Sequence, residues 1–552
     1  MMKMSERCIR LREEAVNKKS YTNKYCLQRA VYFSLGAAKA AEKSSDMAEI
    51  YGAGIANVID KFTPFIAPDE LITGFNFGNK NLAPADVRKE GTVYDLPIAI
   101  GILAANGDID RTAAEKWLII GELALDGSVR GVNGVLPMVI DACSRGYNHI
   151  ILPKENAEEA AFIHDAVVIP VTSLTEAVLF LRGMKIINPQ PCSQTNIDDH
   201  PSFDSDFSLI KGQQAAKRAA EVAAAGNHNI LLIGTPGSGK TMLARSIPSI
   251  LPTLSNEEAL EITKIHSVAG ILRGRGGIVR ERPFRAPHHS ASIPALVGGG
   301  TKALPGEISL AHYGVLFLDE FPEFQKSVLE ALRQPLEDGF VSITRAAAKA
   351  EYPADFMLVA AMNPCPCGNF GSRINPCRCN PSQIERYRNR ISGPMLDRID
   401  IHVEMTEVAY EDLASKQAGE SSAAIRERVS KARCIQRERF KNDGIMFNAQ
   451  MSSKHIKKYC ALEPDAEKLI RLSFDRLRLS ARAYDRLIKV SKTTLRARKK
   501  LQGHALRKPF NIALWTASIG ANCDVIGTAA AERRANGVSK GGQGLYPIEH
   551  CF

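Results

Sequence analysis

The 552-residue sequence lacks any run of about 18 apolar residues, the length needed to cross a membrane. Its opening stretch, MMKMSERCIRLREEAVNKKSY, also lacks the apolar core of a signal peptide. We therefore expect a cytoplasmic protein without a membrane partner, whose 12 cysteines are kept reduced. In a reducing compartment, clustered cysteines indicate metal binding or simple burial before they indicate disulfides.

Internal repeats and low-complexity tracts are missing as well. The composition, 45% hydrophobic and 24% charged, is typical of globular protein and excludes extensive disorder. At this length the chain can form two to four domains with cores of their own. A formal net charge of +11 permits a polyanionic partner such as nucleic acid without establishing one.

The character of the sequence changes several times along the chain. Residues 81–183 mix apolar and turn-rich segments, with strand-like runs at Trp117–Leu123 and His149–Leu152, and predict a small α/β domain. Residues 184–207 are polar and contain proline, as expected of a linker. In residues 208–406 strands and helices alternate, which predicts a parallel sheet with helices on its faces. Residues 407–491 are helical and charged, as in a small helical domain.

The segment GTPGSGKT follows a short apolar strand, Ile230–Ile233, and precedes a helix. It fits the phosphate-binding pattern G-x-x-x-x-G-K-[ST], in which backbone N–H groups surround phosphate oxygens at the positive end of the helix. The lysine reaches the β- and γ-phosphates and the threonine hydroxyl completes the Mg²⁺ shell. The residues expected to bind the nucleotide are Gly234, Thr235, Pro236, Gly237, Ser238, Gly239, Lys240 and Thr241.

Two more apolar strands end in polar residues suited to hydrolysis of the nucleotide. GVLFLDE places Asp319 where it can hold the Mg²⁺ shell, and Glu320 where it can polarise the attacking water. FMLVAAMN ends in Asn363, which we expect to orient the same water. With the glycine loop, these residues predict an ATP hydrolase that uses ATP and Mg²⁺.

Four cysteines follow directly after Asn363 in two Cys-x-Cys pairs: Cys365, Cys367, Cys377 and Cys379. Four thiolates can enclose a tetrahedral Zn²⁺ and so hold a loop that is too short for a core of its own. Structural zinc more often uses C-x₂₋₄-C spacing, so a zinc site and a loop of buried or free thiols both remain open. The arginines that follow, Arg378, Arg386, Arg388 and Arg390, can neutralise phosphates or form a solvated basic face.

In their order along the chain, the glycine loop, Asp319, Glu320, Asn363, Arg398 and Arg482 resemble AAA+ ATPases of the helix-2-insert clade. The stretches RPFRAPHHS, NPCPCG and RYRNRISGPMLDRIDIHVE resemble the YifB/ComM group of magnesium chelatase-like proteins. This resemblance, which covers about residues 81–491, implies an AAA+ P-loop parallel sheet with a helical lid, preceded by a Lon-protease-like α/β domain. It also implies a hexameric ring that acts on single-stranded or branched DNA. In such a ring Arg398 would be the arginine finger reaching a neighbour's ATP, and Arg482 the sensor-2 arginine of the lid.

Two basic elements are expected to contact DNA. Arg273 and Arg275 lie between the nucleotide motifs, and Arg345 and Lys349 lie near the tip of an expected hairpin. By resemblance both elements correspond to pore loops, whose cations would move along a phosphate backbone. The adjacent His288 and His289 are poor joint metal ligands, and we expect them to make structural hydrogen bonds.

Lon-type peptidases require a serine and a lysine. The matching positions here are Tyr94–Leu96 and Leu136, so the resemblance implies a domain without covalent catalysis. This opposes an ATP-dependent protease. The leading expectation is an ATP-dependent DNA helicase or branch-migration factor in natural transformation or recombination. The alternative is a magnesium-chelatase-like ATPase that helps to insert metal into a porphyrin.

The two ends of the chain depart from the family pattern. Residues 1–80 do not resemble the start of a Lon-like domain, and residues 492–552 do not continue the last lid helix. Nucleotides that encode ALRKPFNIALWT can, in another frame, encode the family's usual ending. We therefore expect both ends to be frame-shifted readings, which resequencing the gene would test.

Overall fold

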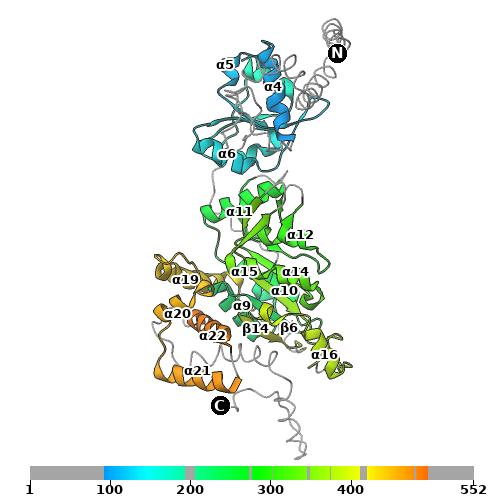
Figure 1. Cartoon of the computed structure of the whole chain (residues 1–552), viewed down its shortest axis with the longest axis vertical. Helices are drawn as coiled ribbons and strands as arrows, with labels where there is room; N and C mark the ends of the chain where they lie inside the picture. Colours follow the sequence, from blue (N-terminus) through cyan, green and yellow to red (C-terminus); the bar gives the residue numbers. More distant parts are fainter. Residues whose placement is uncertain are drawn as a thin grey trace, which may run out of the picture. The chain divides into compact units, whose positions relative to one another are not determined.

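The computed structural model describes residues 92–192, 205–272, 277–300, 303–344, 349–372, 374–408, 410, 414, 419–477 and 480–494. They divide into two compact units (Figure 1). The N-terminal unit also contains Ala259–Val279, a stretch inside the region expected to form the nucleotide-binding core. The N-terminal segment 1–80 and residues 495–552 of the tail lie outside the described residues. Among the helices that the structure describes, none has the length and apolarity needed to cross a bilayer.

The N-terminal unit is built on a three-stranded parallel sheet in the order β1-β4-β5. Alternate residues of β4 enter two cores: Ile151 packs in one, and Ile150 and Leu152 in the other. The expected α/β character is confirmed, although the run Trp117–Leu123 is divided between β1 and a separate hairpin strand, β2. The strands are β1 Leu118–Ile119, β2 Glu122–Leu123, β3 Val129–Arg130, β4 His149–Pro153 and β5 Val167–Val171. The helices are η3 Thr92–Tyr94, α4 Asp95–Ala105, α5 Arg111–Ala114, α6 Val135–Ser144, η4 Lys154–Asn156, α7 Ala157–Ala160 and α8 Leu174–Leu181.

Neither a serine nor a lysine stands at the positions that match the peptidase dyad: Tyr94 and Asp95 are half-buried, and the two leucines are buried. Leu96 in α4 and Leu136 in α6 have no exposed surface. Neither side chain can act as a nucleophile or a base.

The larger unit contains a five-stranded sheet in the order β14-β6-β13-β10-β7. Every neighbouring pair is parallel, which confirms the expected sheet. Because the strands are parallel, the carboxyl ends of β6, β13 and β10 meet at one edge. The strands are β6 Ile230–Gly234, β7 Phe284–Arg285, β10 Val315–Leu318, β13 Met357–Met362 and β14 Ile401–Met405.

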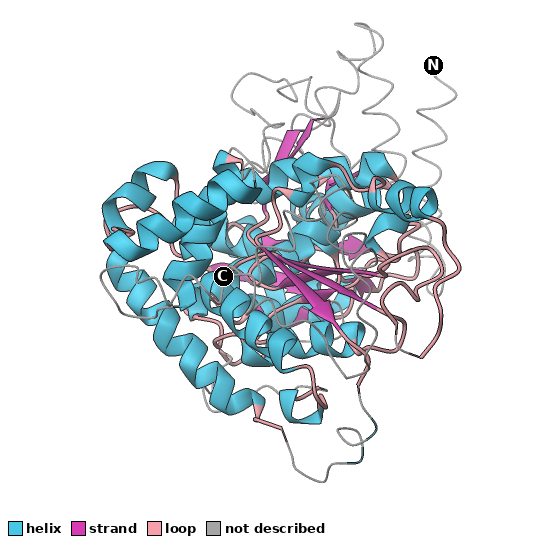
Figure 2. Ribbon diagram, turned by 90° about the horizontal axis from the view of Figure 1, so that it is seen from below, coloured by secondary structure: helices cyan, strands magenta, loops and turns pink. Residues whose placement is uncertain are grey.

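Helices cover both faces of this sheet (Figure 2). Ile230 and Leu232 of β6 face a core that includes buried residues of α9, α10 and α19. Leu231 and Ile233 face the opposite core, which contains residues of α14 and α17. Nearly every residue of the central strands is therefore apolar, as is usual when both faces of a sheet are buried.

The remaining elements of this unit connect the strands and form the lid. The expected hairpin is confirmed, since β11 Phe340–Thr344 pairs antiparallel with β12 Lys349–Pro353; β8 Gly298–Gly299 and β9 Leu304–Pro305 form another pair. The helices before the lid are η5 Phe207–Leu209, α9 Gln214–Gly226, α10 Lys240–Ile250, α11 Asn256–Ala269 (whose last part belongs to the N-terminal unit), α12 Ile293–Val297, α13 Glu307–Leu310, η6 Phe321–Glu323, α14 Lys326–Ala331, α15 Arg333–Asp338, α16 Pro381–Arg388 and α17 Gly393–Leu396. The lid helices are α19 Ser422–Phe440, η7 Asn448–Gln450, α20 Ser453–Tyr459, α21 Pro464–Leu477 and α22 Ala481–Thr494.

A buried histidine joins the lid to the sheet. Nδ1 of His228 lies 2.8 Å from Oδ2 of Asp400, and Nε2 lies 2.8 Å from Oγ1 of Thr493 in α22. The last lid helix is thereby held against the segment that leads into β6.

Candidate nucleotide site and cysteine cluster

The phosphate loop, residues 235–239, connects β6 to α10. Gly237 and Gly239 have φ angles of +79° and +89°, which side chains rarely adopt, so glycine is needed at both turns. A Cβ atom on Gly237 would meet nothing within 4 Å, so the loop faces open space there. Oγ1 of Thr235 and Oγ of Ser238 are buried without a hydrogen-bond partner among the described residues. Unsatisfied groups beside an open loop fit a polar ligand such as a nucleotide phosphate.

Lys240 begins α10 and its side chain lies along this loop. Its Nζ donates to the carbonyl oxygens of Gly234 at 2.7 Å and Thr235 at 2.9 Å, and to Oδ1 of Asn363 at 3.1 Å. Burial lowers the pKa of the Lys240 ammonium, while the charge of Asp319 acts in the opposite direction. The structure thus brings the predicted phosphate-binding lysine and the predicted water-orienting asparagine into direct contact.

The predicted Mg²⁺ ligands also lie together. Thr241 Oγ1 donates to Oδ2 of Asp319 at 2.9 Å, although 78 residues separate them. A hydroxyl and a carboxylate are oxygen donors of the kind Mg²⁺ prefers, so the pair fits that ion bound with ATP. Magnesium would neutralise charge on the phosphates there.

Glu320 follows Asp319 in a left-handed conformation, with φ of +52°. Its N–H donates to Oδ1 of Asp319 at 2.9 Å, and its side chain is 56% exposed. Non-glycine residues in this conformation often occur at functional sites, where the surrounding structure holds them in place. The geometry places a solvent-facing carboxylate immediately beside the Mg²⁺ ligands, as a group that polarises water requires.

The sequence did not reveal the partner of Glu320. Nδ1 of His289 lies 3.1 Å from Oε2 of Glu320, and the His289 ring packs on that of His288 at 4.0 Å between centroids. His288 itself contacts Oγ of Ser290 at 2.8 Å, a structural hydrogen bond as expected. The His289–Glu320 contact is not apparent from the sequence, because only the folding of the segment after β7 brings these two residues together.

The remaining predicted residues of the site fall into two groups, those that the structure describes and those that it does not. Arg398 is bonded to Glu337 and donates to the Pro394 carbonyl at 2.6 Å. Arg482 is exposed on the first turn of α22. The predicted DNA contacts Arg273, Arg275 and Arg345 lie outside the described residues, as does the side chain of Lys349. The roles of all six residues stay predictions.

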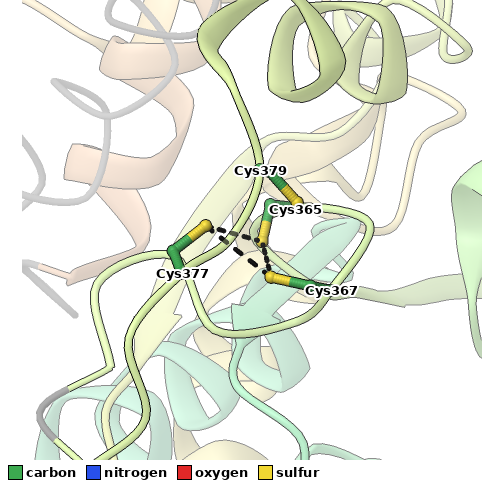
Figure 3. A group of neighbouring side chains, drawn as sticks. All are labelled: Cys365, Cys367, Cys377 and Cys379. Carbon is green, nitrogen blue, oxygen red and sulfur yellow. Dashed lines mark hydrogen bonds between the residues drawn. The ribbon is translucent and has the colours of Figure 1, made fainter.

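The four cysteines converge although they come from two separate pairs (Figure 3). The Sγ atoms of Cys365, Cys367 and Cys377 lie 3.4 to 3.7 Å apart, and all four sulfurs lie within 4.8 Å of one another. Metal–sulfur bonds of about 2.3 Å in a tetrahedron place the sulfurs about 3.8 Å apart. The four thiols therefore fit a structural metal ion, one of the two alternatives that their spacing along the chain had left open.

The surroundings favour the thiolate form at one of the four sulfurs, that of Cys367, whereas burial raises the pKa of the Cys365 thiol and the pKa values of the Cys377 and Cys379 thiols are raised as well. Cys365 is buried, and the N–H of Phe370 donates to its sulfur at 3.3 Å. Backbone N–H groups of Asn369 and Arg378 lower the pKa of the Cys367 thiol to about 6. Such N–H donors stabilise a charged sulfur.

Profiles of known families cover most of the chain. Residues 206–413 match the family described as magnesium chelatase, subunit ChlI; residues 79–156 match subunit ChlI of Mg-chelatase; and residues 419–507 match the ChlI C-terminal family. The chain is 46% identical over 417 residues to competence protein ComM of Haemophilus influenzae, covering 75% of this chain and 80% of that protein. It belongs to the YifB/ComM family of magnesium chelatase-like proteins.

Two further relatives show the range of this likeness. YifB of Salmonella typhimurium is 44% identical over 429 residues, which cover 76% of this chain and 82% of that protein. The magnesium-chelatase 67 kDa subunit of Chlorobaculum parvum is 28% identical over 163 residues, 29% of this chain and 23% of that subunit. Membership of the YifB/ComM family agrees with the AAA+ sheet and with the nucleotide site built on its edge.

Proposed function

We propose that this YifB/ComM-family protein is an ATP-driven DNA motor of the cytoplasm, a hexameric helicase or branch-migration factor. One observation carries the proposal: Lys240, Thr241, Asp319 and Asn363 meet in two hydrogen-bonded pairs at the edge where β6, β10 and β13 end. The likeness to a protein named for competence supports DNA as the substrate.

In this proposal each residue of the nucleotide site has a separate role in ATP hydrolysis. Lys240 and the N–H groups of the phosphate loop bind the phosphates, and Thr241 and Asp319 hold the Mg²⁺ shell. Glu320 polarises the attacking water, and Asn363, already in contact with Lys240, keeps that water in line. Arg398 stabilises the transition state of a neighbouring subunit, and Arg482 contacts the nucleotide from the lid.

In this proposal the ring acts on DNA through cations that sit on short loops. Arg345 and Lys349 belong to the β11–β12 hairpin, while Arg273 and Arg275 lie between α11 and β7. Contacts of this kind neutralise phosphates irrespective of base sequence, so binding should weaken as salt rises.

The test is ATP hydrolysis by the purified full chain with and without forked or four-way DNA, at several salt concentrations. We expect DNA to stimulate hydrolysis and the stimulation to decline with salt. The double variant Arg345→Ala, Lys349→Ala should lose the stimulation and keep the DNA-free rate. Hydrolysis that is indifferent to DNA at every salt concentration would contradict the proposal.

The second candidate is an ATPase that assists metal insertion into a porphyrin, as in magnesium chelatase. The match to the 67 kDa chelatase subunit favours it, but that match covers only 29% of this chain. Stimulation of hydrolysis by a porphyrin-binding partner and not by DNA would support it. The buried side chains of Leu96 and Leu136, which lie at positions matching the peptidase dyad, argue against a protease.

We also propose that Cys365, Cys367, Cys377 and Cys379 bind one Zn²⁺ ion. The short distances between their sulfurs carry this proposal. Elemental analysis of the purified protein should find one zinc per chain, and Cys377→Ser should bind none. Absence of zinc from protein purified without chelators would refute it.

A further inference from the structure

The cysteine loop, residues 364–380, touches the phosphate loop directly. Gly368 has φ of +80°, and a Cβ atom there would lie 2.8 Å from both Cγ and Cδ of Pro236. Pro236 is the third residue of GTPGSGKT, so the loop that carries the thiols packs against the segment that would surround the phosphates. The close approach is possible only because residue 368 has no side chain.

The cysteine loop begins directly after Asn363, and the helix that follows the loop also approaches that residue. Asn363 precedes Cys365 by two residues, and its side chain contacts Lys240 at 3.1 Å. Burial raises the pKa of the hydroxyl of Tyr387, a buried residue of α16, and the backbone of Asn363 lies close enough to act on that pKa in the opposite direction. Helix α16 begins directly after Cys379.

Local contacts make α16 a rigid continuation of the cysteine loop. Asn380 caps the helix: its side chain accepts from the N–H of Gln383 at 2.8 Å, and the Gln383 side chain accepts from the N–H of Asn380 at 3.0 Å. Arg388, at the end of α16, lies over the ring of Phe370 in the loop, 5.6 Å from its centroid. A change in the position of Cys377 or Cys379 would therefore reach Tyr387 and, through it, Asn363.

We propose that the thiolate-bound metal is a structural part of the nucleotide site: by fixing the cysteine loop it holds Asn363 and Pro236 in place, so ATP hydrolysis requires this metal in addition to Mg²⁺. The inference rests on the zinc site proposed above. It adds a regulatory consequence, because removal of the metal by a chelator would stop hydrolysis although every ATP-binding residue stays chemically unaltered.

The physical reason is that most of the described residues of the loop are exposed, although contacts such as the hydrogen bond from Ser372 Oγ to Glu407 Oε1 also hold it. Cys365 is fully buried, whereas Phe370 and Ile374 are 46% and 74% exposed, so most of the loop has no core of its own. Without the metal, the four thiols are no longer bound to one common ion, and the loop is free to move away from Pro236. A displacement of about 1 Å at a catalytic group can lower a rate by on the order of 100-fold.

A pair of glycine variants tests the contact without altering any thiol. In Gly368→Ala the new methyl group collides with Pro236, whereas Gly371→Ala has a nearly identical φ of +82° and meets nothing within 4 Å. Zinc content, affinity for a fluorescent ATP analogue and DNA-free hydrolysis are measured for both. We expect one zinc per chain in each variant, a rate at least about 10-fold lower in Gly368→Ala, and a rate near that of the unaltered protein in Gly371→Ala.

A pair of cysteine variants tests the metal. Cys379→Ser should lose zinc and hydrolysis together, while Cys434→Ser, which alters an exposed cysteine of α19, should keep both. Equal rates for Gly368→Ala and Gly371→Ala would overturn the inference, as would a folded, zinc-free Cys379→Ser protein with the unaltered rate. If Cys379→Ser does not fold, treatment of the unaltered protein with a zinc chelator decides, and a rate that is unchanged after the zinc is removed would overturn the inference.

The outcomes show which proposal fails: the DNA motor, the zinc site, or the requirement for zinc in ATP hydrolysis. An unaltered protein that hydrolyses ATP but does not respond to DNA defeats only the DNA motor. An unaltered protein without zinc defeats the zinc site and this inference with it. A zinc-bound protein in which Gly368→Ala hydrolyses ATP normally defeats this inference alone.

Discussion

His402 is a single residue whose environment, not its neighbours in sequence, sets its chemistry. It lies in β14, is 2% exposed, and its Nε2 is 3.2 Å from the carbonyl oxygen of Ile399. Burial lowers its pKa to about 3, and the charge of Arg486 acts in the same direction. The folded protein thus keeps this imidazole neutral at pH values where the unfolded chain would protonate it.

This difference predicts a loss of stability in acid. The unfolded chain binds a proton near pH 6.5 and the folded chain only near pH 3, so the contribution of His402 is complete above pH 6.5 and falls as the pH drops toward 3. At pH 5 the loss should be about 2 kcal/mol of unfolding free energy. His402→Gln should remove that part of the decline between pH 7.5 and 5, as measured by urea unfolding.

The control is His149→Gln, which alters an exposed histidine at the start of β4. It should leave the pH dependence as it is in the unaltered protein. Parallel pH profiles for His402→Gln and the unaltered protein would show that the protonation of His402 is not linked to unfolding.

At the scale of elements, the pairing of β7 with β10 depends on a glycine that precedes β10. A Cβ atom on Gly314 would lie 2.1 Å from the carbonyl oxygen of Pro283, which also accepts from the N–H of Val315 at 2.8 Å. Because both contacts involve backbone atoms, a side chain at Gly314 forces the strands apart. This strand pairing therefore leaves no room for a methyl group at residue 314.

We predict that Gly314→Ala lowers the free energy of unfolding by about 1–3 kcal/mol, the usual cost of overpacking. Gly393→Ala is the matched control, because Gly393 opens α17 and a Cβ atom there meets nothing within 4 Å. It should change stability by no more than about 1 kcal/mol. Urea unfolding of the two variants provides the comparison, and equal midpoints would contradict the prediction.

For the whole molecule, the question is whether one chain completes the nucleotide site of another. Within its own chain Arg398 is bonded to Glu337 and to the carbonyl oxygen of Pro394, while Lys240 is bonded to Asn363. If it acts in a neighbouring subunit, the active unit is an assembly, and two inactive variants can restore each other.

We expect Lys240→Ala and Arg398→Ala each to abolish hydrolysis, since an arginine finger contributes about 10³-fold or more. A mixture of the two should regain activity, because some interfaces then combine an intact Lys240 with an intact Arg398. A mixture of Lys240→Ala with Glu320→Gln should regain none, since both changes damage the same side of the site. Phosphate release from premixed subunits is the measurement, and no recovery in the first mixture would place Arg398 outside the neighbour's site.

Much of the nucleotide site could be predicted from the sequence because its signals are local. Each of the apolar strands β6, β10 and β13 is followed directly in the chain by at least one polar group that is predicted to bind or hydrolyse the nucleotide. Parallel strands bring such ends together by geometry alone. The contacts of Lys240 with Asn363 and of Thr241 with Asp319 confirm this reasoning.

Other features depended on contacts between distant segments, which no local pattern encodes. The Cys-x-Cys spacing left a metal site and a loop of free thiols both open, and only the folding of the loop brings Cys377 within 3.7 Å of Cys365. The partner of Glu320 is His289, and the neighbour of Pro236 is Gly368; neither follows from spacing along the chain. The sequence by itself determined the kind of chemistry, because residue types and strand order specify it. Only the tertiary structure decided what supports that chemistry, because packing between distant segments sets which groups come within reach of one another.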